Sequence, residues 1–216
     1  LANIKEAGYD WKDPRDAVTI FEQKVAKFAG SKYAIAVDSC TDAVMLCLNY
    51  LMDTDRLEKG SELLFPARSY VSIPMVAMAN GFKVKFEDRE WSGVYNIEPT
   101  PIYDGATRWT DGMYEAGDGY QVVSFQLKKR IPIGKGGMIL TNDKDAVEWF
   151  KMMRYEGRHN TVPYEEDKFG LIGYNMYMTP EDAARGLIIM NQVPRVNEDS
   201  NGSYGIPDLT KQEVFK

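Results

Sequence analysis

Short apolar or β-branched runs alternate with segments of helical pattern along most of this sequence. The predicted strands are residues 33–37, 62–65, 83–86, 101–104, 121–124 and 137–141. The predicted helices begin at Asp13–Pro14, at Ala43, near Pro74, at Asp143 and at Thr179–Pro180, and residues 96–100 are predicted to form a turn. Strands that alternate with helices predict an α/β fold, here a three-layer α/β/α sandwich with a mainly parallel sheet.

The length and the hydrophobic content suit one folded domain. The chain has 216 residues, of which 44% are hydrophobic, which is enough for a sizeable core. We expect residues 1–195 to form this domain. Residues 196–216 are polar with few apolar anchors, so they are expected to form a loose C-terminal tail.

The net charge of −6 argues against a nucleic-acid-binding surface and fits a soluble enzyme that handles small molecules. No run approaches the roughly 20 apolar residues of a membrane span, and the N-terminus has no signal-peptide pattern. Cys40 and Cys47 are seven residues apart in one predicted helix entry, which is too far for a disulfide. These features predict a cytoplasmic protein with reduced cysteines and no membrane or nucleic-acid partner.

A small polar turn at residues 39–42 connects the first predicted strand to a strongly apolar helix. Backbone N–H groups at such a helix N-terminus can bind a phosphate group. Ser39, Thr41 and Asp42 could equally do no more than cap the helix. For this turn taken alone, capping is the stronger interpretation.

Polar or aromatic residues follow the ends of four predicted strands. They are the turn at residues 39–42, Tyr70, Asp104 and Ser124. Ligands of parallel α/β sheets bind beyond the carboxyl ends of the strands. The four groups are therefore expected to converge on one edge of the sheet and to form one binding site.

The segment Val122–Thr141 places Lys129 between two predicted strands, five residues after Ser124 and before a cluster of glycines. This layout is typical of a lysine that forms a Schiff base. Such a lysine needs a lowered pKa to present a free amine, and we expect the charges of Lys128 and Arg130 to lower the pKa of Lys129. The alternative is a solvent-exposed basic hairpin, which this segment alone favours.

Together, these motifs resemble the DegT–DnrJ–StrS family of sugar aminotransferases, which are pyridoxal-phosphate (PLP) enzymes of the aspartate aminotransferase fold, fold type I. The resemblance runs from about Phe21 to about Ala184. It is carried by SFQLKKRIPIGKGG at residues 124–137, SCTDA at 39–43, Tyr70, YDGA at 103–106 and YNM at 174–176. Each motif is weak alone, but their order and spacing indicate that residues 1–195 form a PLP-binding large domain of this fold.

The resemblance implies that Lys129 forms the internal aldimine with PLP and then moves protons between the cofactor and the substrate. It also implies that the phosphate group of PLP is bound without formal positive charge. The implied phosphate ligands are the hydroxyls of Thr41 and Ser124 and the backbone around Cys40 and Asp42.

Four further positions match the family. Asp104 would keep the pyridine nitrogen protonated, and Tyr70 would stack on the cofactor ring. Thr107 stands where the family usually has glutamine or histidine near the hydroxyl of the ring. Asn175 would reach the phosphate in the neighbouring subunit, which implies a homodimer with shared active sites.

The implied function is transfer of an amino group from an amino acid such as glutamate to a keto-sugar nucleotide. Family members usually continue for roughly 150 further residues, which form a small domain that closes over the cofactor. A naturally short member, a second chain that supplies this part, or a cut sequence would each explain the difference. The main alternative is therefore a truncated, non-catalytic or partner-dependent PLP-fold protein.

Some residues depart from the family pattern. Cys40 replaces a glycine, which would cost about 1 kcal/mol if the position required a positive φ, and Tyr177 stands where an arginine is common. His159 is the only histidine and is expected in a loop, and no His–Cys cluster predicts a metal site. A nucleotide-binding module is disfavoured because residues 39–42 form no glycine-rich loop followed by lysine. Dehydrating relatives are disfavoured because they carry histidine in place of Lys129.

Overall fold

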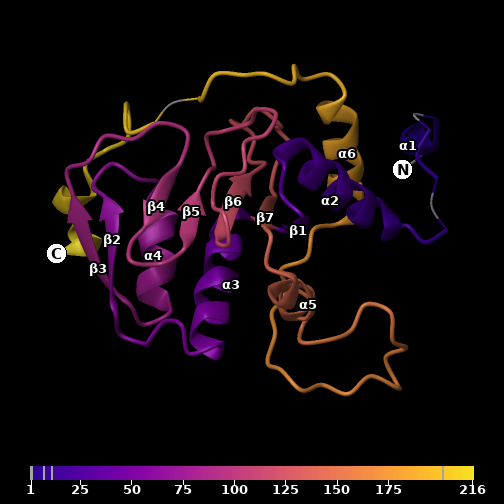
Figure 1. Cartoon of the computed structure of the whole chain (residues 1–216), viewed down its shortest axis with the longest axis horizontal. Helices are drawn as coiled ribbons and strands as arrows, with labels where there is room; N and C mark the ends of the chain where they lie inside the picture. The colour runs from indigo at the N-terminus through magenta and orange to yellow at the C-terminus, as the bar shows by residue number, and fades with distance from the viewer. Residues whose placement is uncertain (1, 7, 11, 201) are drawn as a thin grey trace.

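A computed structural model describes residues 2–6, 8–10, 12–200 and 202–216, and it has helices on both faces of a β-sheet (Figure 1). The strands are β1 (Tyr33–Val37), β2 (Glu62–Pro66), β3 (Lys83–Glu87), β4 (Tyr95–Ile97), β5 (Ile102–Asp104), β6 (Tyr120–Ser124) and β7 (Gly137–Thr141). The helices are α1 (Ala2–Glu6), α2 (Asp16–Ala29), α3 (Cys40–Asp53), α4 (Ser72–Ala79), α5 (Lys144–Met153) and α6 (Pro180–Met190), followed by two short 3₁₀ helices, η1 (Leu209–Lys211) and η2 (Glu213–Phe215). The predicted α/β class is confirmed.

The sheet is mixed rather than mainly parallel. The main sheet has the order β1-β7-β6-β5-β4, and β2 pairs with β3 in a second ladder. Only the β5–β6 and β2–β3 pairs are parallel, whereas β1–β7, β6–β7 and β4–β5 are antiparallel. The expected mainly parallel sheet is wrong, because the direction of a strand depends on how its connection crosses the sheet. Residues 105–119 connect β5 to β6 as parallel neighbours and residues 125–136 connect β6 to β7 as antiparallel neighbours, and neither connection contains a helix that would indicate its direction in the sequence.

Strand β4 was predicted as part of a turn, and it joins the two ladders. It pairs with β5, and just after it Glu98 accepts a hydrogen bond at 2.8 Å from the backbone N–H of Leu64 in β2. Pro99 and Thr100 do form the predicted turn, but only after the three residues of the strand. Strand β4 therefore connects the main sheet to the β2–β3 ladder.

Side chains cap three of the helices at the predicted positions. The Ser39 hydroxyl accepts a hydrogen bond from the Asp42 amide at α3, Asp143 caps α5, and Thr179 caps α6 with Pro180 in the first turn. The start of α2 differs from the prediction, because Asp13 does not cap it. Instead, the Asp16 carboxylate accepts hydrogen bonds from the backbone N–H groups of Lys12 and Asp13.

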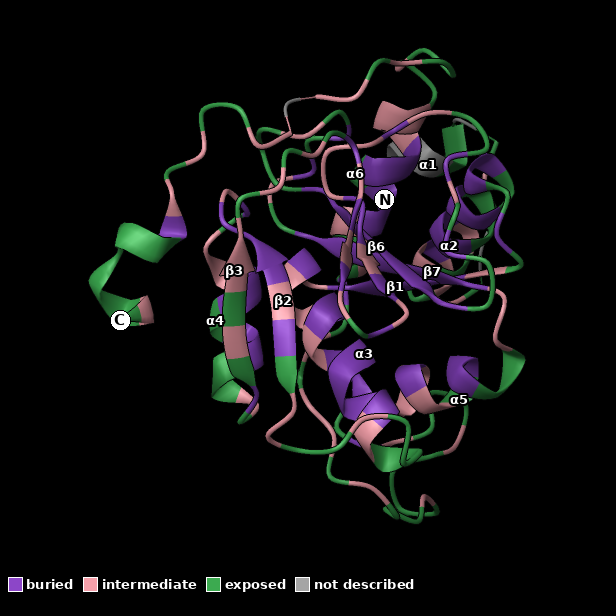
Figure 2. Ribbon diagram, turned by 60° about the vertical axis from the view of Figure 1, so that its left-hand side comes forward, coloured by how far each residue is buried: buried purple, intermediate pink, exposed green. Residues whose placement is uncertain are grey.

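Two hydrophobic clusters lie on opposite faces of the sheet. Helices α3, α4 and α5 pack on one face and α2 and α6 on the other. In β1, Ile35 and Val37 point into the first cluster, and Ala34 and Ala36 into the second. Figure 2 shows β1, β6 and β7 buried between the two layers. This arrangement is the predicted three-layer sandwich.

The C-terminal tail at residues 196–216 makes more contacts than the sequence suggested. It crosses the top of the molecule in Figure 1 and ends beside β3. Leu209 is only 1% exposed, its backbone N–H donates to the Ala67 carbonyl at 2.8 Å, and the ring of Phe215 contacts that of Phe86. Two apolar side chains therefore anchor a segment expected to be loose.

Within the part of the chain that the structure describes, no helix has the length and apolar character needed to cross a membrane.

Candidate active site

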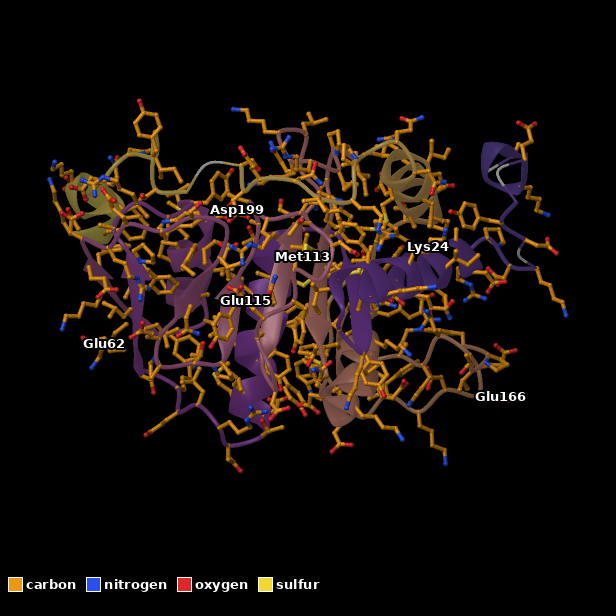
Figure 3. The ribbon with its side chains drawn as sticks, turned by 45° about the horizontal axis from the view of Figure 1, so that its top comes forward. Lys24, Glu62, Met113, Glu115, Glu166 and Asp199 are labelled. Atoms are coloured by element: carbon orange, nitrogen blue, oxygen red, sulfur yellow. The ribbon has the colours of Figure 1, made fainter. Side chains whose placement is uncertain are left out.

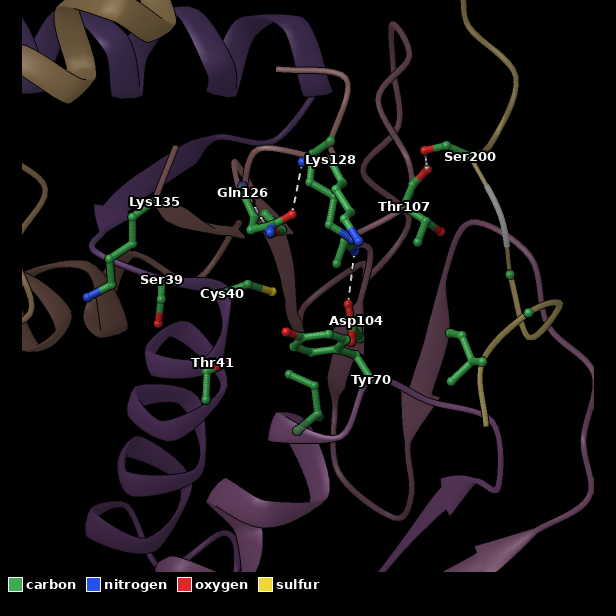
Figure 4. A pocket seen from close by; sticks show the side chains of 18 of the residues that line it. Ser39, Cys40, Thr41, Tyr70, Asp104, Thr107, Gln126, Lys128, Lys135 and Ser200 are labelled. Atoms are coloured by element: carbon green, nitrogen blue, oxygen red, sulfur yellow. Dashed lines mark hydrogen bonds between the residues drawn. The ribbon is translucent and has the colours of Figure 1, made fainter. Parts of the chain in front are cut away.

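A cavity of about 630 Å³ lies at the edge of the sheet where β5 and β6 end and α3 begins (Figure 4). Seven of the nine predicted cofactor-binding residues line it, and they are Cys40, Thr41, Tyr70, Asp104, Thr107, Ser124 and Lys129. They come from segments far apart in the sequence. The expected convergence of strand ends on one site is therefore observed.

The first turn of α3 forms one wall of the cavity. Ser39 caps the helix, and the hydroxyls of Thr41 and Ser72 lie 2.6 Å apart. Cys40 is the first residue of α3 and does not have a positive φ, so the strain considered for cysteine at this position does not arise. The Ser39 side chain thus caps α3, and the N-terminus of this helix still faces the cavity.

Strand β7 comes very close to this turn. A Cβ atom on Gly137 would lie 2.4 Å from the Ser39 carbonyl oxygen and 2.5 Å from the Cys40 nitrogen. Only glycine fits there without movement of the backbone. The glycine cluster of the lysine segment therefore has a packing role against the α3 N-terminus.

Asp104 is a buried carboxylate at the end of β5. Its Oδ1 accepts a hydrogen bond from the Ala106 amide at 2.9 Å, and its Oδ2 accepts one from the Tyr95 hydroxyl at 2.8 Å. Burial raises the pKa of Asp104, while these two donors and the charge of Lys129 act in the opposite direction. The carboxylate is thus held in place at an electrostatic cost.

Lys129 lies in the loop between β6 and β7, and its backbone N–H donates to the Gln126 carbonyl at 2.8 Å. Its side chain is half-buried, whereas Lys128 and Arg130 are exposed. Burial raises the pKa of the Cys40 thiol well above its usual value, the charge of Asp104 adds to this rise, and the charge of Lys129 opposes it. Lys129 therefore acts electrostatically on both Asp104 and Cys40, which line the same cavity.

Tyr70 and Thr107 line the cavity in different ways. Tyr70 is 62% exposed, so its ring is free to cover a ligand. The Thr107 hydroxyl donates to the Gly93 carbonyl at 3.1 Å, and the Thr107 carbonyl accepts two hydrogen bonds from Ser200 in the tail. The expected place of Thr107 near a ring hydroxyl stays a prediction, and its own hydroxyl already has an acceptor.

Two predicted residues lie outside the cavity lining. Asp42 faces Ser39 and Asp38 at the first turn of α3, and burial together with Asp38 raises the pKa of Asp42 to about 6. Asn175 is exposed, and its amide donates to Glu156 at 2.6 Å. A role of Asn175 in a neighbouring subunit requires a second copy of the chain and stays a prediction.

Sequence reasoning missed three contributions to this site. Tyr95 lies in the unpredicted strand β4, Lys135 lines the cavity while its ammonium binds Asp38 at 2.7 Å, and tail residues complete one wall. The tail residues are Ser200, Gly202, Tyr204, Gly205 and Ile206. Polar composition gave no signal for the tail, whereas the hydrophobic residues Leu209 and Phe215 could have marked its anchors.

Salt bridges fix the tail beside the cavity. Arg108 binds Asp199 through two hydrogen bonds of 2.9 and 2.8 Å, and it also binds Glu115 at 2.6 Å. Figure 3 labels both acidic partners and shows Asp199 on the tail above the sheet. Among the described residues, no group of three or more His, Cys, Asp or Glu side chains is arranged to hold a metal ion.

The sequence of this chain is similar to those of known proteins. SpsC, a spore coat polysaccharide biosynthesis protein of Bacillus subtilis (strain 168), is 23% identical over 242 aligned residues, covering 89% of this chain and 60% of SpsC. The GDP-perosamine synthase of Caulobacter vibrioides is 25% identical over 220 residues, covering 82% of this chain and 56% of the synthase. The chain therefore spans about 60% of the length of these relatives.

The solved structure of a GDP-4-keto-6-deoxymannose-3-dehydratase with a trapped PLP–glutamate geminal diamine has the same fold. It superposes with a TM-score of 0.69 at 21% identity, over 83% of this chain and 61% of the dehydratase. This likeness supports the fold type I prediction for the large domain.

Part of the length difference is internal. Since 89% of this chain is about 192 residues, about 50 of the 242 positions aligned with SpsC have no counterpart here. The expectation that the difference lies at the C-terminal end is thus incomplete.

The profile of one family covers nearly all of the sequence. It matches residues 6–116 and 105–204, two pieces that overlap just after β5, so the alignment is not one continuous run. With this match over most of its length, the chain belongs to the DegT/DnrJ/EryC1/StrS aminotransferase family.

Proposed function

We propose that this chain binds PLP in the cavity and is the large domain of an aminotransferase that acts on a keto-sugar nucleotide. The observation that carries the proposal is the placement of Lys129 and Asp104. A half-buried lysine and a buried carboxylate line one cavity next to a helix N-terminus. These are the three kinds of group that PLP needs: an amine, a partner for its ring nitrogen and a phosphate site.

Asp104 supports this assignment through its energetics. Burial raises the pKa of Asp104, so the ionised form is costly in the protein alone. A protonated pyridine nitrogen beside the carboxylate would offset that cost and would itself stay protonated. The bound cofactor would then serve as the electron sink of the reaction.

The phosphate group of PLP would bind at the wall formed by the first turn of α3. The Thr41 hydroxyl, the backbone N–H groups at the helix N-terminus and Ser124 provide donors there. These groups would bind and orient the phosphate without formal positive charge. Lys135 lies near the same wall, but its ammonium is paired with Asp38 at 2.7 Å, which raises the pKa of Lys135.

Lys129 would hold the cofactor covalently in the resting state. After substrate exchange its free amine would carry a proton between cofactor and substrate, as a general base and then a general acid. Tyr70 would cover the ring and exclude water. Lys128 also lines the cavity but is exposed, whereas Lys129 is half-buried, so we assign this role to Lys129.

The substrate class follows from the relatives. A GDP-perosamine synthase and a polysaccharide biosynthesis protein are both similar to this chain, which supports a nucleotide-linked keto-sugar as acceptor. An amino acid such as glutamate would be the donor. Asn175 would act in a second subunit of a homodimer, and the buried free thiols Cys40 and Cys47 fit the reducing cytoplasm.

A second function is a PLP protein that depends on a partner chain for turnover. The chain spans about 60% of the length of the curated relatives it matches. The two functions share the cofactor site and differ in turnover.

The decisive experiment is reductive trapping. The purified protein incubated with PLP is expected to gain a visible absorbance band, and borohydride should fix the cofactor on the peptide that contains Lys129. Lys129→Ala should remove this label, whereas Lys128→Ala, the matched control, should keep it. Label on Lys128, or no label at all, would contradict the assignment.

Turnover is measured separately. The loaded protein is mixed with a keto-sugar nucleotide and glutamate, and 2-oxoglutarate is quantified. Formation of 2-oxoglutarate beyond one equivalent per cofactor, and only when the keto-sugar nucleotide is present, supports the aminotransferase, and trapping without such turnover supports the partner-dependent protein.

A further inference from the structure

Tyr95 and Asp104 form a cross-strand pair. The antiparallel register of β4 and β5 places the two residues directly opposite one another. Both are buried, and the Tyr95 hydroxyl donates to Asp104 Oδ2 at 2.8 Å. Sequence reasoning gave no role to Tyr95, because the strand that carries it was not predicted.

We propose that Tyr95 is a positioning residue that fixes the orientation and the negative charge of Asp104 beside the cofactor ring. This inference rests on the proposed function, because it assumes that Asp104 faces a pyridine nitrogen. Each oxygen of the carboxylate has one protein donor, namely the Tyr95 hydroxyl on Oδ2 and the Ala106 amide on Oδ1. Together they define the plane of the carboxylate.

The Tyr95 ring is itself held rigidly. The Trp91 ring lies against it with centroids 4.7 Å apart, and the indole N–H of Trp91 donates to the Arg68 carbonyl at 2.9 Å. Pairing of β4 with β5 fixes the backbone on the other side. The phenol can therefore hold the carboxylate with little loss of side-chain freedom.

The ionisable groups around Asp104 favour a donor role for Tyr95. Burial and the charge of Asp104 raise the pKa of Tyr95 well above its usual value, so the phenol keeps its proton. Lys129 acts on Asp104 with a positive charge, and the Cys40 thiol is kept neutral by burial. Tyr95 is thus a neutral donor to the one buried anion among these groups.

Removal of the Tyr95 hydroxyl should weaken the interaction between Asp104 and the ring nitrogen of PLP. Tyr95→Phe keeps the aromatic packing but leaves Oδ2 without this donor, which favours the protonated form of Asp104. A protonated Asp104 no longer pairs with a pyridinium. PLP binding should weaken about tenfold, the cost of one hydrogen bond to a charged group.

The experiment compares PLP with an analogue in which C–H replaces the ring nitrogen. Dissociation constants are measured for the parent, Tyr95→Phe and Tyr120→Phe. Tyr120 is the matched control, because its buried hydroxyl donates to Asp143 at 2.7 Å and lies outside the cavity lining. Tyr95→Phe should weaken binding of PLP and leave binding of the analogue unchanged, and Tyr120→Phe should affect both ligands equally.

Equal weakening of both ligands by Tyr95→Phe would show a merely structural role and overturn the inference. In an Asp104→Asn background, Tyr95→Phe should have no further effect on the ratio of the two constants, and a further effect would also overturn it. A parent protein that binds neither ligand would instead refute the proposed function.

A folding failure is informative as well. If Tyr95→Phe does not fold, adding Asp104→Asn should restore folding, because the unpaired buried charge is then gone. A double variant that also fails to fold would count against the pair.

Discussion

A Cβ atom placed on Gly137 would lie 2.4 Å from the carbonyl oxygen of Ser39. This relationship ties the strand after the lysine loop to the turn at the start of α3. The two segments that carry the proposed amine and the proposed phosphate site are therefore packed directly against one another.

Gly137→Ala should destabilise the protein by about 1–3 kcal/mol, because the clash is with backbone atoms that cannot rotate away. Urea unfolding measures the free-energy difference. Gly170→Ala is the control, since no atom lies within 4 Å of a Cβ at that position. If the two variants were equally stable, β7 and the turn at the start of α3 could move apart at little cost in free energy, which would contradict the prediction.

Asp42→Asn should change the pH dependence of stability. The pKa of Asp42 is raised from 3.8 to about 6 by burial and by Asp38, so the folded state binds this proton more tightly than the unfolded state does. Stability contributed by Asp42 is therefore lost as pH rises from about 4 to about 6. The melting temperature of Asp42→Asn relative to the parent should rise across that window.

The same comparison has a simple internal check. Asp118→Asn removes an exposed carboxylate, so the difference in melting temperature between this variant and the parent should stay constant across the window. A difference in melting temperature between the parent and Asp42→Asn that stays constant across this pH window would contradict the prediction.

Asp199→Ala should loosen the tail. The change removes both hydrogen bonds to Arg108, which remains paired with Glu115. A loss of about 1 kcal/mol of anchoring corresponds to about fivefold faster cleavage of the tail by a dilute protease. Glu198→Ala alters an exposed neighbour and should leave the cleavage rate unchanged.

Glu22→Gln should be strongly destabilising, because it leaves the buried Arg154 guanidinium without its carboxylate partner. Loss of one partner of a buried ion pair costs about 3–5 kcal/mol. Chemical denaturation measures this cost, with Glu148→Gln, in a more exposed pair with Lys151, expected to cost less than about 1 kcal/mol. Similar costs for both variants would contradict the burial argument.

Strand composition predicted most of the sheet, but not its directions. The apolar runs that became β1, β6 and β7 are nearly identical to the predicted strands. Direction depends on the connections, and two connections without a helix lead to opposite results, because β6 is parallel to β5 whereas β7 is antiparallel to β6. Strand β4 escaped prediction because three residues before Pro99 carry too little periodicity to distinguish a strand from a turn.

The site was predictable where strand ends carry the chemistry. Asp104 and Ser124 end their strands, and the turn at residues 39–42 follows β1, so topology brings them together. Tyr95 joins the site through its pairing with Asp104 across β4 and β5, which was missed because β4 was not predicted. Ser200 joins the site through long-range packing against Thr107, which no local pattern encodes. Local composition predicts the helices and strands, whereas the cavity walls formed by loops depend on how the whole chain folds.

The residues that line the cavity range from Ser39 to Ile206, which is most of the sequence. During synthesis the N-terminal part of a chain leaves the ribosome first. The α3 turn therefore exists long before the segment that covers it. A ligand that needs every wall can therefore be enclosed only after translation has passed Ile206.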